Sequence, residues 1–504
     1  MEPQQAYSEL VRRFKERSTM DSIGSVLAWD ERTYMPLGGS AHRAEQMALM
    51  ARLGHDMLTA PVMGELLDTC EGSPLVKDAQ SDAAVNVREI RRLHNRAVKM
   101  PPKLVEELAR TTTRAQQVWQ EARQANEFES FRPWLTKVVD LKRQEAQAVG
   151  YHEVPYDALL DDYEPGATTR EITRVFADLR ADLAPLVAII TGTGKKPRKG
   201  ILEREYPVAR QEVFGQAAAT AIGFDFHAGR LDVTAHPFCS GIGPGDCRLT
   251  TRYHSHHFNQ GFFGILHEAG HGIYDQGLDP AHYGTPLGMA VSLGIHESQS
   301  RLWENQVGRS RPFWEHFFPR ARQVFHAALA DVSLDDFLFA INDVEPSFIR
   351  VEADEATYNM HIILRFELEQ ALVSGDLKAA DVPGAWNEKF QQSLGLTPPS
   401  NALGCLQDVH WSFGGIGYFP TYTLGNMYAA QFMEQAREDL PHLDEAFRRG
   451  EFGSLKSWLN EKIHRPGQRY RASELCERIT GKPLSHKPLL IYLRTKYARL
   501  YSLQ

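Results

Sequence analysis

The stretch FFGILHEAGH, residues 262–271, joins an apolar run to the pattern HExxH. On a helix, His267 and His271 lie one turn apart on the same face, so both imidazoles can bind one metal ion. Glu268 lies ~100° further round the helix, beside the ion, where a general base for metal-bound water belongs. The apolar run predicts a buried helix, and Gly277 predicts its end. Without a metal, the same pattern is typical of a core helix with two hydrogen-bonded histidines.

Two histidines leave a catalytic zinc site one protein ligand short. Glu297, in the segment GIHESQ at residues 294–299, is the main candidate, because this segment also reads as a helix and can pack antiparallel to the first. Asp275 and Glu304 are competing acids, and Asp275 can instead accept a hydrogen bond from an imidazole N–H. An ion pair between Glu297 and Arg301 at i+4 is the interpretation that needs no metal.

Helical periodicity dominates on both sides of the motif. Short β-like runs at Arg230–Thr234 and Arg248–Tyr253, broken by GIGPGD at 241–246, predict one small antiparallel sheet in the middle of the chain. We therefore expect a mainly α protein. The clearest helical stretches are Ala41–Leu58, Val87–Lys99, Lys103–Glu127 and Glu171–Thr191.

Neither a linker nor an internal repeat divides the chain, which predicts a single domain over residues 1–504. Within it we expect a helical N-terminal part to about residue 222, then a part with the sheet and the metal site, about 223–426. A helical C-terminal part covers about 427–504.

The composition favours a soluble globular protein. Of 504 residues, 42% are hydrophobic and 24% charged, and the formal net charge is −8, which argues against a nucleic-acid partner. No apolar run approaches the ~20 residues of a membrane span, and the N-terminus has no apolar signal region. Five scattered cysteines favour reduced thiols in a cytoplasmic protein. Because no CxxC pair occurs, a thiolate zinc site is not expected.

Several segments, in order, resemble the signatures of one peptidase family. With the motif at 267–271 they indicate similarity to the carboxypeptidase Taq family of zinc metallocarboxypeptidases, over residues from about 27 to 426. The matching segments are Leu27–Asp30 with Met35-Pro36, His236–Phe238 (HPF), Asp246–Thr250 (DCRLT), His296–Gln299 (HESQ), Ile349–Asp354 (IRVEAD) and Gly404–Trp411 (GCLQDVHW).

This resemblance implies that Glu297 is the third metal ligand. It implies a large helical, saddle-like peptidase domain with a deep groove, usually a homodimer. The expected metal is zinc, for which cobalt can substitute. The expected activity is the stepwise removal of C-terminal residues from peptides with a free C-terminus, broad in preference and poor at proline.

The resemblance also implies roles for residues outside the metal motif. Arg350 is the main candidate for binding the α-carboxylate of the substrate, since a guanidinium can hold a carboxylate through two hydrogen bonds. Without the resemblance, the sequence favours Arg350 as a helix-surface arginine paired with Asp354. His410 is the candidate for stabilising the oxyanion or holding substrate. Further contacts with substrate are implied for His236, Tyr418 and Tyr422.

We therefore expect a carboxypeptidase that works by Glu268-assisted attack of metal-bound water on the peptide carbonyl. One alternative is a zinc oligopeptidase that cuts internal bonds of short peptides with the same ligands. The other is a non-catalytic peptide-binding protein with a degenerate peptidase fold. The presence of Glu268 together with all three expected ligands argues against this second alternative.

Overall fold

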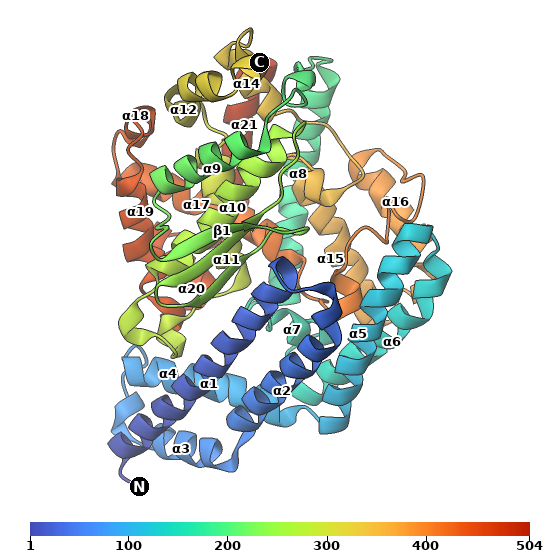
Figure 1. The fold of residues 1–504 in the computed structure, drawn as a ribbon. Coiled ribbons are helices and arrows are strands. Elements are labelled where there is room, and N and C mark those ends of the chain that lie inside the picture. The colour runs from blue at the N-terminus through green and yellow to red at the C-terminus, as the bar shows by residue number, and fades with distance from the viewer. Residues whose placement is uncertain (504) are drawn as a thin grey trace.

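Helices make up most of the protein in a computed structural model, which describes residues 1–503 (Figure 1). The predicted helical stretches correspond to α2 (Ser40–Thr59), α4 (Asp82–Lys99), α5 (Pro102–Ala125) and α8 (Thr169–Gly192). α5 begins at a proline, whose fixed φ suits the first helical turn. The mainly α fold is confirmed.

The N-terminal helices form a layer of their own. α1 (Pro3–Thr33), α3 (Pro61–Glu71) and α4 bury a small apolar cluster between them, and the rest of the chain shares one large core. In Figure 1 this blue layer lies at the lower edge of the molecule, below the sheet. No helix within residues 1–503 is long and apolar enough to cross a membrane. The remaining helices are α6 (Phe128–Val149), α7 (Pro155–Leu160), α9 (Val208–Ile222), α12 (Arg311–Val324), α13 (His326–Leu329), α14 (Leu334–Ile341), α15 (Tyr358–Ser374), α16 (Val382–Leu394), α17 (Pro420–Asp439), α18 (Leu443–Arg448), α19 (Gly453–Leu459), α20 (Ala472–Thr480) and α21 (Lys487–Tyr501).

The predicted small sheet is present and has three strands, β1 (Gly229–Val233), β2 (Cys239–Gly243) and β3 (Asp246–Thr251), in the order β1-β3-β2. It is mixed, not wholly antiparallel as expected, because β1 pairs with β3 in parallel. A tight turn at Gly245 makes β2 and β3 an antiparallel hairpin. The longer connection at 234–238 places β2 at the far edge of the sheet, and β3 then pairs between β1 and β2.

The sheet lies over α10 (Phe258–Gly277), the helix that carries the HExxH motif and ends where the sequence predicts (Figure 1). α11 (Leu293–Arg301) packs closely against α10 and continues as a π-helical turn, Leu302–Val307. Gly270 makes this approach possible, because a Cβ there would lie 2.6 Å from the Cα of Ser300. The two helices are thereby held close enough to share one metal site.

Candidate metal centre

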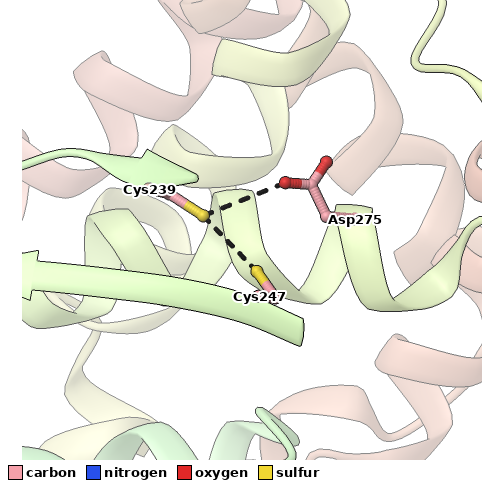
Figure 2. Close-up of side chains that lie close together, drawn as sticks. All are labelled: Cys239, Cys247 and Asp275. Carbon is pink, nitrogen blue, oxygen red and sulfur yellow. Dashed lines mark hydrogen bonds between the residues drawn. The ribbon is translucent and has the colours of Figure 1, made fainter. Parts of the chain in front are cut away.

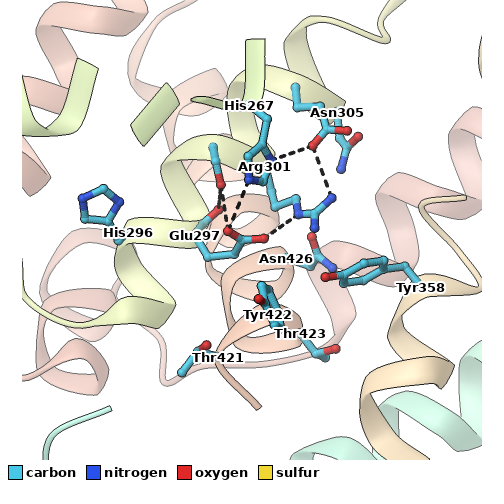
Figure 3. A network of polar contacts seen from close by, with 12 residues as sticks. His267, His296, Glu297, Arg301, Asn305, Tyr358, Thr421, Tyr422, Thr423 and Asn426 are labelled. Atoms are coloured by element: carbon cyan, nitrogen blue, oxygen red, sulfur yellow. Dashed lines mark hydrogen bonds and ion pairs between the residues drawn. The ribbon is translucent and has the colours of Figure 1, made fainter. Parts of the chain in front are cut away.

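Three side chains from α10 and α11 converge as donors for one ion. The Nε2 atoms of His267 and His271 lie 3.7 Å and 3.4 Å from Oε2 of Glu297, and the three donor atoms are all within 4.8 Å of one another. Donors about 2.1 Å from one tetrahedral ion stand roughly 3.4 Å apart. The geometry therefore fits a single divalent metal ion, and Figure 3 shows Glu297 directed at His267.

Local sequence at the start of α11 fixes the position of Glu297. The Ser292 hydroxyl caps the helix, and the buried carboxyl group of Glu164 accepts a hydrogen bond of 3.0 Å from the N–H of Gly294. On the other side, α17 approaches at Gly425, where a Cβ would lie 2.6 Å from Cγ of Glu297. Close packing on both sides leaves this carboxylate little freedom to turn away from the histidines.

Each imidazole is oriented through its second nitrogen. His267 Nδ1 lies 2.9 Å from Oε2 of Glu304, and His271 Nδ1 lies 2.6 Å from His296 Nδ1. His296 Nε2 in turn lies 3.0 Å from Oδ1 of Asp275. If His271 donates to His296 and His296 donates to Asp275, every nitrogen is satisfied and both Nε2 lone pairs face the third ligand. The two competing acids thus support imidazoles, and neither belongs to the ligand triad.

Charge around the triad keeps Glu297 ionised. Burial alone would raise its pKa, but Arg301 and His267 outweigh burial and hold the pKa well below its usual range. Arg301 Nε donates to Oε1 of Glu297 at 2.7 Å, and Nη1 donates to Oε2 of Glu304 at 3.2 Å. The ion pair that the sequence offered as an alternative is therefore present together with the triad, because each uses a different oxygen of Glu297.

Glu268 lies beside the triad at the wall of a large cavity. It is 6% exposed, and burial raises its pKa to about 7. The cavity has a volume of about 920 Å³, and His267, Arg350, Tyr358 and Tyr422 also line it. This volume corresponds to the deep groove that the resemblance implies and is large enough for part of a peptide.

Arg350 is buried at the cavity wall and pairs with Asp408, not with Asp354. Its Nε and Nη2 donate to Oδ1 of Asp408 at 3.0 and 2.8 Å, and Nη1 donates to the hydroxyl of Tyr358 at 2.9 Å. Arg365 Nε donates to the other oxygen of Asp408 at 2.7 Å. The Asp354 pairing was wrong because this carboxylate accepts from nearby backbone N–H groups. Two guanidiniums share one carboxylate, which leaves one net positive charge near the cavity.

The other expected substrate residues divide into two groups. His410 is buried with its Nε2 3.1 Å from the hydroxyl of Tyr422, and its ring packs 5.2 Å from that of Tyr418. Burial lowers the pKa of His410 to about 3, so the imidazole is neutral. His236, in contrast, is exposed on the loop between β1 and β2, and its neighbour Pro237 lines the cavity where His236 does not.

Sequence reasoning missed several partners of the site residues. Glu304 was considered only as a competing ligand, although its spacing of i+7 from Glu297 places it two turns on along the same helix face. His296 and Asp408 lie within the quoted signature segments, but spacing alone gives no reason to pair them with His271 and Arg350. Those contacts depend on the tertiary fold.

Comparison with known proteins finds one peptidase family. The family model for carboxypeptidase Taq (M32) metallopeptidases matches residues 9–497. The chain is 52% identical to thermostable carboxypeptidase 1 of Thermus thermophilus over 99% of this chain and 100% of the relative. It is 40% identical to carboxypeptidase 1 of Bacillus subtilis over 95% of each chain. The fold matches the crystal structure of the M32 carboxypeptidase of Deinococcus radiodurans with a TM-score of 0.95 at 40% identity, covering 99% of this chain and 100% of that one.

Proposed function

Because the chain belongs to the carboxypeptidase Taq (M32) family of metallopeptidases, we propose that it removes C-terminal residues one at a time from peptides with a free α-carboxylate. It is a metallocarboxypeptidase, and the predicted family is confirmed. What carries the finer proposal is that His267 of the triad, Glu268 and the guanidinium of Arg350 line one cavity. We further propose a cytoplasmic homodimer of broad preference.

His267, His271 and Glu297 would hold the metal ion. Two imidazoles and a carboxylate are the ligand set of catalytic zinc sites, so we propose Zn²⁺, with Co²⁺ able to replace it. When bound, such an ion supplies Lewis acidity, which polarises the scissile carbonyl and makes water more acidic. Glu304 and His296 keep the two ligand imidazoles in the tautomer that leaves Nε2 free.

Glu268 is the proposed general base. It lies one residue from His267 on α10 and lines the same cavity, so its carboxylate can reach a water beside the triad. In this role it takes a proton from the attacking water and passes the proton to the nitrogen of the leaving residue. Its burial excludes bulk water, which would otherwise compete for that proton.

Arg350 is the proposed binding group for the α-carboxylate of the substrate. Asp408 and Tyr358 occupy only part of its donor set, and the Nη atoms retain N–H groups for an incoming carboxylate. Since Arg365 also binds Asp408, the cluster keeps a net positive charge. A peptide with an amidated C-terminus would lose this interaction.

Tyr422 and His410 are proposed to act together on the scissile carbonyl. Tyr422 lines the cavity, whereas His410 lies behind it within hydrogen-bonding distance of the tyrosine hydroxyl. If His410 Nε2–H donates to that oxygen, the phenol proton is free to donate to the developing oxyanion. His410 is then a positioning residue. Contacts of Tyr418 and His236 with substrate stay predictions.

The test is to incubate one peptide with metal-loaded protein, as the free acid and as the C-terminal amide, each with and without a chelator. Mass spectrometry should show a chelator-sensitive ladder that loses one C-terminal residue at a time from the free acid only. Internal fragments from both forms would contradict the carboxypeptidase proposal and favour an oligopeptidase. The homodimer is tested separately by sedimentation of the purified protein.

A further inference from the structure

Two cysteines and an aspartate meet on the side of α10 that faces the sheet (Figure 2). Cys239 lies on β2, Cys247 on β3 and Asp275 on α10, one turn beyond His271. The two Sγ atoms are 3.6 Å apart, and Sγ of Cys239 is 3.9 Å from Oδ2 of Asp275. All three donor atoms lie within 4.8 Å of one another. The cluster shares no ligand with the triad.

Strand register holds the two sulfurs close without joining them. Cys239 lies opposite Leu249, and Cys247 lies opposite Gly241, so the cysteines are diagonal neighbours. Diagonal positions on an antiparallel pair have Cα atoms about 7–8 Å apart. A disulfide usually needs Cα atoms about 4.4–6.8 Å apart. The register therefore disfavours a bond between the sulfurs.

The separations match a shared ion instead. Two sulfurs bound at about 2.3 Å to one tetrahedral zinc ion stand roughly 3.8 Å apart, and a sulfur and a carboxylate oxygen roughly 3.5 Å. The observed distances of 3.6 and 3.9 Å are close to both values. Thiolates with one carboxylate are donors that zinc and softer ions prefer over magnesium or calcium.

We propose that Cys239, Cys247 and Asp275 form a second metal site, selective for a thiophilic divalent ion such as Zn²⁺ or Cd²⁺. A cavity of about 490 Å³, lined by Cys247, Asp275 and Gly241, gives the ion access and leaves a position for solvent. Gly241 keeps the carboxylate reachable, because a Cβ there would lie 2.7 Å from Oδ2 of Asp275. This site goes beyond the proposed peptidase function and does not rest on it.

Binding exchanges protons for the ion. Each thiol S–H breaks and each sulfur forms a bond to the metal, so one divalent ion releases two protons and nothing is oxidised or reduced. In the ion-free protein, the hydrogen bond that Cys239 donates to Cys247 and burial raise the pKa of Cys239, and burial raises that of Cys247, which keeps the pair as thiols. The bound state therefore carries Asp275 and two thiolates against the two positive charges of the ion.

Asp275 can bind an ion with one oxygen while the other oxygen keeps its contact with His296. Its Oδ1 accepts from His296 at 3.0 Å, whereas Oδ2 faces Cys239. His296 in turn contacts His271 of the triad at 2.6 Å. Filling the second site therefore leaves the orientation of the catalytic imidazole intact, and the two sites can be occupied together.

The experiment titrates metal-free, reduced, full-length protein with Co²⁺ and, separately, with Cd²⁺. Native mass spectrometry should count two ions per chain. Near-ultraviolet absorption should show a sulfur-to-metal charge-transfer band for one of them, since the triad contains no sulfur. The double variant Cys239→Ser/Cys247→Ser should lose the band and one ion. Glu297→Gln should weaken the other ion and keep the band, so failure of the peptidase proposal and failure of this one are distinguishable.

Cys70→Ala is the matched control, because Cys70 is buried in the separate N-terminal cluster and should leave the band and both ions unchanged. Asp275→Asn is a second variant in case the double variant does not fold, and it should weaken the band while still accepting from His296. One ion per chain without a band would overturn the proposal, as would a band that survives in Cys239→Ser/Cys247→Ser. An intact mass lower by two hydrogens in metal-free protein would show a disulfide and also overturn it.

Discussion

The two donor clusters on α10 lie one turn apart and differ in how their charge is balanced. Glu297 of the triad and Glu304 beside it are both paired with Arg301, so these carboxylates are stabilised before any ion arrives. Asp275 has no lysine or arginine partner within the described residues 1–503, and its neighbouring thiols stay protonated. The first cluster is therefore preorganised, whereas the two thiols of the second become charged only when an ion displaces their protons.

The cavities beside the two clusters also differ. The triad opens onto a cavity of about 920 Å³ with Arg350 in its wall, whereas the cysteine cluster opens onto about 490 Å³. Catalysis needs a base and a charged group beside the metal, and only the first cluster has Glu268 and Arg350. Under the two proposals, metal binding and catalysis are therefore separable on one helix.

The largest expected effect comes from Glu268→Gln. The amide keeps the shape of the side chain but cannot accept the proton, so kcat should fall by roughly 10²–10⁴-fold. Both ions should still bind, which assigns the chemistry to the first cluster alone. Steady-state kinetics with a chromogenic peptide measure the loss, and Cys239→Ser is the control that keeps the wild-type kcat. Appreciable activity of Glu268→Gln would contradict the general-base role.

Local spacing made the triad predictable. The pattern at 267–271 places two candidate ligands within one helical turn, and a segment of compatible periodicity carries the third candidate, Glu297. The family signatures then added Arg350 and His410 by resemblance. The fold class followed from periodicity in the same way, because helices are local structures.

Contacts set by tertiary structure were not predictable. Arg350 reaches Asp408 across 58 positions, so a pairing with nearby Asp354 looked better from sequence alone. Cys239 and Cys247 meet only because of the β2–β3 register, and the search for a CxxC pair could not find them. The mixed sheet escaped prediction for the same reason, since strand order depends on which segment fills the central position.

The next effect is on metal affinity, and it tests Glu304 at the triad and Asp275 at the cysteine cluster separately. Glu304→Gln should weaken the ion at the triad by roughly 10–100-fold, because His267 loses an anionic partner that raises its basicity. The charge-transfer band of the second ion should be unchanged. Asp275→Asn should weaken mainly the second ion, because its amide oxygen can still accept from His296 and so keep the His271 imidazole in place. Competition with a chelator measures both affinities, and an equal loss at both sites in either variant would show that the clusters are not independent.

A smaller effect tests Arg350, which lines the cavity of the first cluster and has no counterpart at the second. Arg350→Ala should raise KM for free-acid peptides roughly tenfold, the value of one charge-assisted hydrogen bond, and change kcat much less. Asp408 stays paired with Arg365, so the variant should fold. Arg350→Lys keeps the charge and should recover part of the loss. An unchanged KM would remove Arg350 from recognition of the α-carboxylate.

The smallest effect concerns α11. This helix carries Glu297 of the triad and His296, which contacts Asp275 of the cysteine cluster. Glu164 anchors the start of this helix, and burial raises its pKa from 4.5 to about 7. Between these values the folded state holds a proton that the unfolded chain has released, so the stability contributed by this group falls as pH rises from 4.5 to 7. One such group changes stability by at most about 1.4 kcal/mol per pH unit.

Glu164→Gln carries a permanently neutral amide and should flatten this slope. Its carbonyl can still accept from the N–H of Gly294, so the helix start should keep its place. The measurement is urea unfolding of metal-free wild type and variant across the interval, because only their difference isolates Glu164 from other buried carboxyls. A variant with an unchanged slope would mean that Glu164 is ionised in the folded protein. The group that anchors α11 would then be a carboxylate at neutral pH, and its negative charge would lie against the start of the helix, where neither cluster balances it.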